Sequence, residues 1–388
     1  MRRAAALSLI VLLLLATPAC AAAPRPAAQG PDHALRITPA PGPARAAPGQ
    51  PIMITANGGT LREVQVTSGG VPVPGRFAPG RTSWRSSRPV VPGRAYQVRA
   101  EGMSPSGDPM AAGGRFRAAR AGQTLGVRYV SPLPGETVGV GAPIIVVFDT
   151  PVHERAAVEQ ALRVHTSGGP VAGAWRWIDD TQVIYRPRAY WPSGTRVRLT
   201  ADLAGVRAAD RTYGVADHTS DFAVGRRQIS HIDTRAKRMT VTVDGRVVRR
   251  IPISAGNART LEYTTTSGTH LTMEKANPVR MVSPGRKKGD PGYYNVLIDH
   301  AVRISNSGEY VHAKNNVWAQ GRVNVSHGCV NVRPDLAAWF YDRSLRGDPV
   351  VITGTNRPLE WWNGWGYWQM PWSQWREGSA LPEGGLSR

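Results

Sequence analysis

The stretch VNVSHGCVNV, Val323 to Val332, carries one of the two cysteines of this 388-residue chain. β-branched residues flank the cysteine on both sides, and such residues favour strands. Gly328, between His327 and Cys329, permits a tight turn in which consecutive backbone N–H groups point the same way. A developing oxyanion in acyl transfer requires such a group of amides. The stretch therefore predicts a loop in a β-rich domain that presents a thiol, a histidine and backbone donors together.

A basic neighbour would make this thiol a nucleophile, because it favours the thiolate. His327 lies two residues before Cys329, and His312 lies on a predicted strand, GEYVH, that a β fold can bring next to the loop. Ser326 is placed to hold the loop by hydrogen bonding. Two other interpretations stay open. One is a buried structural cysteine with a satisfied histidine, and the other is a zinc site, which lacks paired ligand spacing.

The N-terminal stretch MRRAAALSLIVLLLLATPAC, residues 1–20, has a basic start, an apolar run and small residues, which is the plan of a secretory signal. Cys20 stands where a lipoprotein signal carries its acylated residue, and cleavage after Ala21 or Ala23 is the alternative. In either case Cys329 keeps no disulfide partner, so its presence in an oxidising compartment favours a chemical role. Residues 21–33 are rich in Ala and Pro and predict a flexible tether.

The net charge of +21 is spread over the whole length, mostly on arginines. No basic helix, finger or aromatic RNA-binding motif accompanies this charge, so nucleic acid is not the predicted partner. For an exported protein, the charge favours anionic envelope polymers or the membrane surface as partners. Solvated surface charge without a specific partner is the alternative. The length predicts two or three domains.

Two segments, residues 34–124 and residues 125–226, look like copies of one unit. Three short matches keep their order in both: PGQPIMITAN with VGAPIIVVFD, TSWRS with GAWRW, and PGRAYQVRAEG with PSGTRVRLTADL. Short alternating runs punctuated by Pro and Gly predict an all-β sandwich for each copy. Trp84, Trp175 and Trp177 are then expected in the cores, between the two sheets of each sandwich.

Residues 227–354 stay β-rich but change in character. KRMTVTVDGRVVRRIPISAG predicts a hairpin that turns at its Asp-Gly pair, and RPDLAAWFYDRSLRG predicts a helix that begins at Pro334 and stops at Gly347. Residues 355–388 crowd tryptophans into LEWWNGWGYWQMPWSQWREG. This tail predicts a Trp-rich cap packed onto the preceding domain, and stacking on carbohydrate is the alternative.

VHAKNNVWAQGRVNVSHGCVNV resembles the signature of the L,D-transpeptidase (YkuD-type) catalytic domain, in which sixteen residues separate a histidine from the cysteine of Ser-His-Gly-Cys. TTTSGTHLTMEK and ISNSGEYVH are similar to two strands of that family. AAWFYDRSLRGDPVVI and MPWSQWREG resemble the helix and Trp-bearing tail of its actinobacterial multidomain members. The resemblance implies a mainly β chain, with two immunoglobulin-like β-sandwich domains followed by a β-rich catalytic domain that has a short helix and the Trp-rich cap.

The resemblance further implies an acyl-transfer site. Cys329 would be the nucleophile, and His312 would be the base that later returns the proton. The backbone carbonyl of Ala313 would orient His312, and the amides of His327, Gly328 and Cys329 would hold the oxyanion.

A substrate cleft is implied as well, covered by a flap whose sequence departs from that of the relatives. The positions that match substrate contacts are Tyr294 (with Tyr293 as the alternative), Ser307, Gly308 and Asn331, and Met273 and Trp318 would line the two mouths of the tunnel.

The implied reaction joins peptidoglycan stem peptides. The thiolate attacks the carbonyl of the third stem residue and expels the terminal D-Ala, and a side-chain amine of a second stem captures the acyl-enzyme in a 3→3 cross-link. This chemistry requires no metal and no organic cofactor. Carbapenems are implied as covalent inhibitors, and a lipid-anchored position in the cell envelope, facing the wall, as the location. An L,D-carboxypeptidase and a non-catalytic cell-wall-binding protein are the alternative functions.

Overall fold

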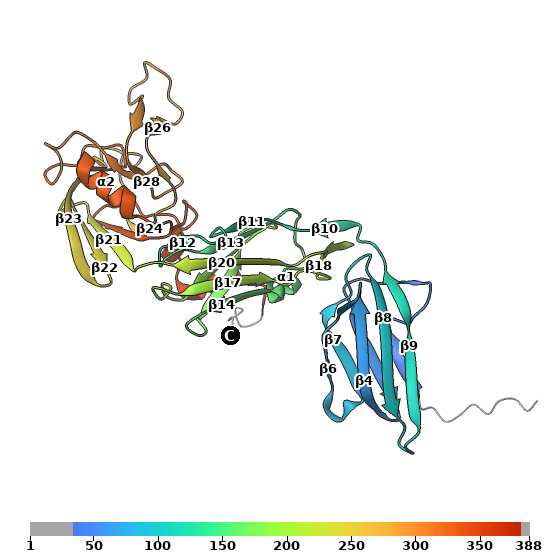
Figure 1. Cartoon of the computed structure of the whole chain (residues 1–388). Coiled ribbons are helices and arrows are strands. Elements are labelled where there is room, and N and C mark those ends of the chain that lie inside the picture. The colour runs from blue at the N-terminus through green and yellow to red at the C-terminus, as the bar shows by residue number, and fades with distance from the viewer. Residues whose placement is uncertain (1–33, 382–388) are drawn as a thin grey trace, which may run out of the picture.

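The computed structural model describes residues 34–381. Three bodies follow one another along the chain: a β-sandwich nearest the N-terminus, a second β-sandwich in the middle and a larger β-rich domain at the far end (Figure 1). The mainly β architecture predicted from the sequence is confirmed. The predicted signal peptide, the predicted lipidation site Cys20 and the tether of residues 21–33 lie outside the described residues.

The first sandwich consists of two sheets whose strands alternate between buried and exposed side chains. Trp84 is 4% exposed in the core, as predicted. The strand orders are β1-β3-β7-β6 and β2-β9-β8-β4-β5. The elements are β1 (Ala34–Thr38), β2 (Arg45–Ala46), β3 (Pro51–Asn57), β4 (Thr60–Ser68), β5 (Val71–Pro72), β6 (Gly75–Phe77), the 3-10 turn η1 (Pro79–Arg81), β7 (Ser83–Pro89), β8 (Ala95–Met103) and β9 (Pro109–Ala118).

The second sandwich has sheets of order β11-β13-β16-β15 and β12-β20-β17-β14, with a small sheet β10-β19-β18 beside them. Trp175 and Trp177 are buried, which confirms their prediction as core residues. The elements are β10 (Gln123–Leu125), β11 (Val127–Ser131), β12 (Thr137–Val138), β13 (Ile144–Phe148), α1 (Arg155–Ala161), β14 (Leu162–Thr166), β15 (Gly173–Trp177), β16 (Gln182–Pro187), β17 (Arg196–Ala201), β18 (Arg207–Ala209), β19 (Thr212–Gly214) and β20 (His218–Val224).

The third body is built on one sheet of order β24-β31-β21-β22-β23-β30-β29-β28-β25. Asp244 and Gly245 turn the predicted hairpin with φ of 49° and 81°, since a two-residue turn of this kind needs positive φ at both positions. The elements are β21 (Gln228–Asp233), β22 (Arg238–Val243), β23 (Arg246–Ser254), β24 (Gly268–Leu271), β25 (Lys275–Ala276), β26 (Val279–Val282), β27 (Asn295–Ile298), β28 (Ala301–Arg303), β29 (Tyr310–Ala313), β30 (Val330–Val332), α2 (Pro334–Arg343) and β31 (Pro349–Thr353).

Helix α2 begins at Pro334, as predicted, but ends at Arg343 rather than at Gly347. Ser344 leaves the helix with an extended backbone, and its hydroxyl donates to the carbonyl of Phe340 at 2.7 Å. Gly347 lies in the following turn at φ 90°, where a Cβ would come within 2.5 Å of the Ala142 side chain. Close contact with the second sandwich therefore requires glycine at this position.

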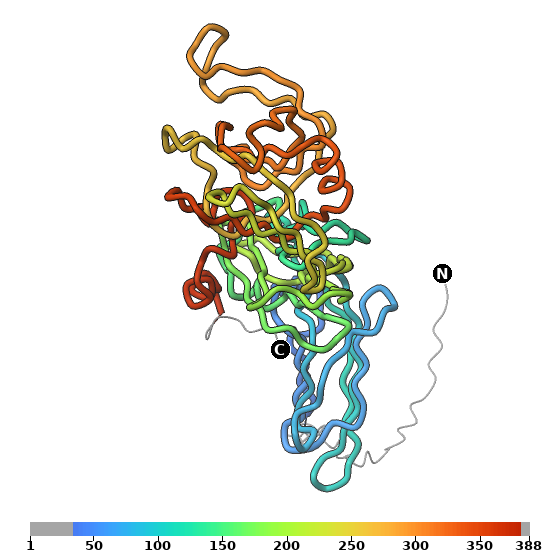
Figure 2. Tube along the Cα trace, turned by 90° about the vertical axis from the view of Figure 1, so that its left-hand side faces the viewer, coloured from blue at the N-terminus to red at the C-terminus, as the bar shows by residue number. Residues whose placement is uncertain are grey.

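The Trp-rich tail covers the second sandwich. It contains a 3-10 turn, η2 (Gly366–Gln369), and a short helix, α3 (Trp372–Arg376), and it runs along the outer face of that sandwich (Figure 2). Its buried aromatic and apolar residues pack against strands β13, β15 and β16, in a cluster that contains Ile145, Ala174, Ile184, Tyr367, Met370 and Trp375. The predicted cap thus buries the apolar outer face of the β11-β13-β16-β15 sheet. It also packs on the catalytic domain, where the Thr269 amide donates to the Gln369 side chain at 2.7 Å and the Leu359 amide donates to the Ser267 carbonyl at 2.8 Å.

The second sandwich and the third body are also joined directly. Arg346 forms an ion pair with Glu136 at 3.0 Å and donates to the Ser131 hydroxyl at 3.1 Å. The Gly139 amide donates to the Arg346 carbonyl at 2.8 Å. These bonds from side chain and backbone hold the two bodies in one orientation.

Candidate active site

Two parallel strands bring the predicted base and nucleophile together. β29 and β30 pair with Val311 opposite Val330 and His312 opposite Asn331. Side chains alternate along a strand, so the two valines face the core, while His312, Asn331 and Cys329 line a cavity of about 460 Å³. Pairing thus brings together His312 and Cys329, which sixteen residues separate in the chain.

The loop before Cys329 is held by its own hydroxyl group, as predicted for Ser326. The Ser326 hydroxyl donates to the Cys329 carbonyl at 2.5 Å and accepts from the Gly328 amide at 3.1 Å. Gly328 has a φ of 125°, which favours glycine, and its carbonyl accepts from the Thr265 hydroxyl at 2.7 Å. The loop is therefore fixed from both sides.

One of the three amides predicted for the oxyanion is engaged in this loop. The Gly328 N–H donates to Ser326, whereas the described part of the chain offers no hydrogen-bond acceptor to the amides of His327 and Cys329. These two amides are the donors that remain for a bound carbonyl oxygen.

His312 has the orientation that a base needs. Its Nδ1 lies 2.9 Å from the Ala313 carbonyl, which only accepts, so Nδ1 carries the hydrogen and Nε2 keeps its lone pair. Burial lowers the pKa of His312 to about 4. Burial also raises the pKa of the half-buried Cys329 thiol to about 12. Both groups are therefore uncharged at neutral pH, and His312 can accept the thiol proton during attack.

The flap carries Tyr294 over the cavity. Its ring stacks on His327 at a centroid distance of 5.7 Å, and Tyr263 stacks on the same histidine at 4.3 Å. Arg286 of the flap binds both carboxylate oxygens of Glu262 at 2.7 Å. Tyr294 lines the cavity and its neighbour Tyr293 does not. Of the two flap tyrosines, Tyr294 therefore has the position expected of a residue that contacts substrate.

The other predicted substrate positions divide into two groups. Ser307, Gly308 and Asn331 line the cavity with Cys329. Met273 and Trp318 do not line it. The Met273 sulfur packs so closely against Gly364 of the tail that a Cβ at position 364 would come within 2.9 Å of it. The Trp318 side chain is 65% exposed. Met273 is kept out of the cavity because it packs against the tail, and Trp318 is kept out because its side chain faces solvent.

Known proteins share both halves of this architecture. Residues 227–352 match the family model of the L,D-transpeptidase catalytic domain, and residues 44–207 match that of the bacterial Ig domain. L,D-transpeptidase 5 of Mycobacterium tuberculosis is 34% identical over 362 residues, which span 91% of this chain and 78% of that protein. The chain belongs to the L,D-transpeptidase family.

Two further relatives agree with this assignment. L,D-transpeptidase 2 of Mycobacterium tuberculosis is 35% identical over 340 residues, or 85% of this chain and 81% of that protein. The solved structure of LdtMt1 in complex with imipenem covers 59% of this chain and 99% of its own, at 35% identity and a TM-score of 0.50. The chain is thus an enzyme of the L,D-transpeptidase type, and the predicted resemblance is confirmed.

Sequence reasoning missed three features of this L,D-transpeptidase. The Glu262–Arg286 ion pair joins the flap to a loop across the cavity, and the sequence spacing of the two residues does not indicate that they pair. Glu309 is buried at the cavity wall, where its position between a glycine and a buried strand was a usable signal. Asn363 reaches the cavity loop from the tail.

Asn363 connects the Trp-rich tail to the L,D-transpeptidase cavity. Its Oδ1 accepts from the Ser307 amide at 2.9 Å, and its Nδ2 donates to the Ser307 hydroxyl at 3.0 Å. Ser307 is followed by Gly308, whose carbonyl lies 3.5 Å from the Cys329 sulfur. The tail therefore holds the segment that contacts the thiol.

Replacement of Asn363 by alanine is expected to slow acylation of Cys329 about tenfold, because two hydrogen bonds that hold Ser307 are lost. The rate of adduct formation with a carbapenem measures this effect. Ser373→Ala, an exposed position in the same tail, is the matched control. An unchanged rate in Asn363→Ala would show that the cavity loop keeps its position without the tail.

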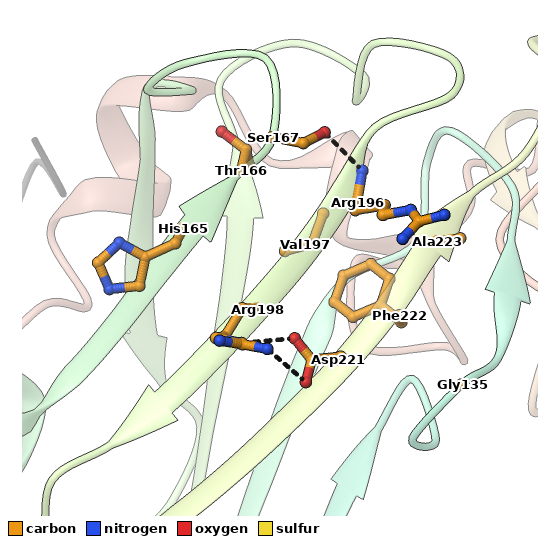
Figure 3. A pocket seen from close by; sticks show the side chains of 10 residues that line it. All are labelled: Gly135, His165, Thr166, Ser167, Arg196, Val197, Arg198, Asp221, Phe222 and Ala223. Atoms are coloured by element: carbon orange, nitrogen blue, oxygen red, sulfur yellow. Dashed lines mark hydrogen bonds and ion pairs between the residues drawn. The ribbon is translucent and has the colours of Figure 1, made fainter.

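A second hollow lies on the exposed sheet face of the middle domain (Figure 3). It has a volume of about 560 Å³. Arg198 is paired there with Asp221 at 2.7 Å, and the Arg196 amide donates to the Ser167 hydroxyl. The hollow contains no cysteine and no histidine–nucleophile pair, so the cavity around Cys329 is the candidate active site of this L,D-transpeptidase.

No helix in residues 34–381 is long and apolar enough to span a membrane. No three His, Cys, Asp or Glu side chains in the same residues gather closely enough to hold a metal ion.

Proposed function

We propose that this L,D-transpeptidase forms 3→3 cross-links between peptidoglycan stem peptides through an acyl-enzyme on Cys329. The observation that supports the proposal is the shared cavity of Cys329 and His312, with the histidine oriented by the Ala313 carbonyl. Proton transfer and backbone donors supply the catalysis. No step needs a metal or an organic cofactor.

Acylation begins when a tetrapeptide donor places the carbonyl of its third residue over the sulfur. Nε2 of His312 takes the thiol proton as Sγ attacks the carbonyl carbon, and the amides of His327 and Cys329 hold the oxyanion. The bond between the third residue and D-Ala then breaks. The proton on His312 passes to the leaving amine, and D-Ala departs, which leaves a thioester on Cys329.

The acyl group then moves to the acceptor. A side-chain amine of a second stem, such as that of diaminopimelate, attacks the thioester carbonyl and loses a proton to His312. The carbon–sulfur bond breaks, and the thiolate regains the proton from the histidine. The product is an amide between the third residues of two stems, and the enzyme returns to its initial state.

Mass spectrometry of a disaccharide-tetrapeptide incubated with the enzyme tests this proposal. Dimers that have lost one D-Ala are the expected product, and Cys329→Ala should give none. Tripeptide monomers alone would make the protein an L,D-carboxypeptidase at the same site. Unchanged tetrapeptide with the wild-type protein would favour a non-catalytic cell-wall-binding role.

The rate of acylation is expected to rise with pH through about pH 4 and to stay level through neutral pH. The pKa of His312 lies at about 4 and that of Cys329 at about 12, so the free imidazole and the neutral thiol coexist between these values. Carbapenem adduct formation, followed by intact mass across this range, measures the profile. Circular dichroism at each pH confirms that the protein is folded. A step in the rate between pH 6 and 8 would instead indicate a preformed thiolate–imidazolium pair.

Export, anchoring and inhibition complete the proposal. We infer that residues 1–20 direct the chain to the cell envelope, where a lipid on Cys20 anchors it, and that its charge of +21 favours anionic envelope polymers or the membrane surface. Loss of labelled palmitate in Cys20→Ala tests the anchor. The complex of LdtMt1 with imipenem supports carbapenems as covalent inhibitors of this enzyme.

A further inference from the structure

A buried carboxylate lies beside the proposed nucleophile. Glu309 is 4% exposed, precedes strand β29 and lines the same cavity as Cys329. Its Oε1 accepts from the Thr266 amide at 2.7 Å, and its Oε2 accepts from the Thr266 hydroxyl at 2.6 Å. No Lys or Arg within residues 34–381 forms an ion pair with it. Burial of a carboxylate without a cation is unfavourable, so a balancing charge is expected nearby.

His270 lies behind Thr266, where it can supply that charge. It is fully buried, with Nδ1 3.1 Å from the Ile304 carbonyl and Nε2 3.0 Å from the Thr266 carbonyl. Carbonyl oxygens only accept hydrogen bonds, so the form of the ring that satisfies both contacts is the one in which both nitrogens donate. The Thr266 hydroxyl donates to Glu309 and accepts from Nε2 of His270 at 3.3 Å. The three residues form a continuous hydrogen-bonded relay.

The relay reaches the sulfur through the residues on either side of Glu309. The carbonyl of Gly308 lies 3.5 Å from Sγ of Cys329, and the backbone of Tyr310 hydrogen-bonds the same thiol. The Glu309 amide is itself held by the Ser305 hydroxyl at 3.1 Å. Residues 308–310 thus contact the sulfur through the Gly308 carbonyl and the Tyr310 backbone. Thr266 holds the side chain of Glu309 between them.

The charge of Glu309 acts on the thiol as well. Burial is the main reason why the pKa of Cys329 is raised, the hydrogen bond from Tyr310 lowers it, and the negative charge of Glu309 raises it further. Several other titratable or charged groups face the thiol or line its cavity. They are Tyr310, His312 and Lys314 on or after β29, His327 on the thiol's own loop, Arg286 and Tyr294 on the flap, Glu262 and Tyr263 on the facing loop, and Arg357.

We propose that the His270–Thr266–Glu309 relay is a positioning device that holds residues 308–310 against the Cys329 sulfur. In it, the Glu309 charge favours the protonated thiol, and the link through Thr266 to His270 partly offsets that charge. The inference rests on the proposed role of Cys329 as the nucleophile. Glu309 and Thr266 are positioning residues, since they act through Cys329 and its neighbours. The thiol then loses its proton to His312 only when a substrate carbonyl is in place.

The pH dependence of Cys329 alkylation by iodoacetamide tests the relay in the full-length protein. The thiolate displaces iodide and forms a carbon–sulfur bond, so the rate follows deprotonation. Glu309→Gln keeps the shape and removes the charge, and it should lower the midpoint of the profile by about one pH unit. Thr266→Val removes the hydroxyl that links the anion to His270 and should raise the midpoint. Thr266→Ser restores the hydroxyl and should match the wild type.

Glu274→Gln is the matched control, because it removes an exposed carboxylate of the same domain that pairs with Arg303. Its midpoint should equal that of the wild type. A general loss of packing would move Glu309→Gln and Thr266→Val in the same direction, and that result would overturn the proposal, as would an unchanged midpoint in Glu309→Gln. If Glu309→Gln does not fold, the proposal is tested by Thr266→Val alone: a raised midpoint of the alkylation profile supports it, and an unchanged or lowered midpoint overturns it. Alkylation is read by mass at Cys329, so it does not depend on dimer formation, which tests the proposed function separately.

Discussion

Replacement of Cys329 by alanine is expected to abolish the covalent adduct that the wild-type protein forms with a carbapenem. The strained ring carbonyl is expected to be attacked by Sγ in the same geometry as a stem-peptide carbonyl, and the amides of His327 and Cys329 are the donors proposed for the developing oxyanion. Cys329 is the only cysteine among the described residues, so no other thiol there replaces it. Intact mass of the folded protein after incubation measures the adduct.

His312→Ala should keep the adduct but slow its formation by about 10²- to 10⁴-fold, the usual contribution of a general base. The reason is that burial holds the thiol in its neutral form, with a pKa of about 12, so a proton acceptor is needed during attack. Lys287→Ala, at an exposed position on the flap, should react at the wild-type rate. Adduct formation that persists in Cys329→Ala would show that Cys329 is not the nucleophile and would favour its interpretation as a structural cysteine.

The pair at the centre of this site was predictable because it depends on local pattern. His312 lies on a strand, and the Ser326 hydroxyl holds the turn of Ser326, Gly328 and Cys329 through two local hydrogen bonds, so the sequence carried that part of the information. The alternation of side chains on β29 and β30 then places both groups on one face. The sandwich cores were predictable for the same reason, since buried tryptophans such as Trp84 occur in short alternating strands.

The contacts that escaped prediction are made between segments far apart in the chain. Met273 was expected in the cavity, but it lies against Gly364, ninety-one positions later, and nothing in either segment indicates that contact. Asn363 and Glu262 likewise find partners through the fold rather than through spacing. The Trp-rich tail is the largest case, because its apolar composition predicted burial without specifying which domain it would cover.

Removal of the tail after Leu359 is expected to destabilise the protein strongly, and the second sandwich is where the loss should occur. Trp375 is fully buried and donates from Nε1 to the Ala174 carbonyl at 3.0 Å. Arg186, 3% exposed, lies 4.9 Å from the Trp375 ring and donates to the Met370 carbonyl at 3.1 Å. Truncation would expose this apolar sheet face and leave the guanidinium without its aromatic contacts.

Two single substitutions in the tail make this prediction quantitative. Trp375→Ala should lower the free energy of unfolding by about 3–5 kcal/mol, the range for a large aromatic residue removed from a core. Trp362→Ala is the matched control, because its side chain is 62% exposed, and it should change stability by less than about 0.5 kcal/mol. Denaturant unfolding of the full chain, followed by fluorescence, measures both. Equal effects of the two substitutions would mean that the tail contributes no specific core. If Trp375→Ala lowers the free energy of unfolding by the expected amount and Trp362→Ala leaves it unchanged, the tail is part of the core of the second sandwich. That packing then also keeps Asn363 in place to hydrogen-bond Ser307 of the cavity loop.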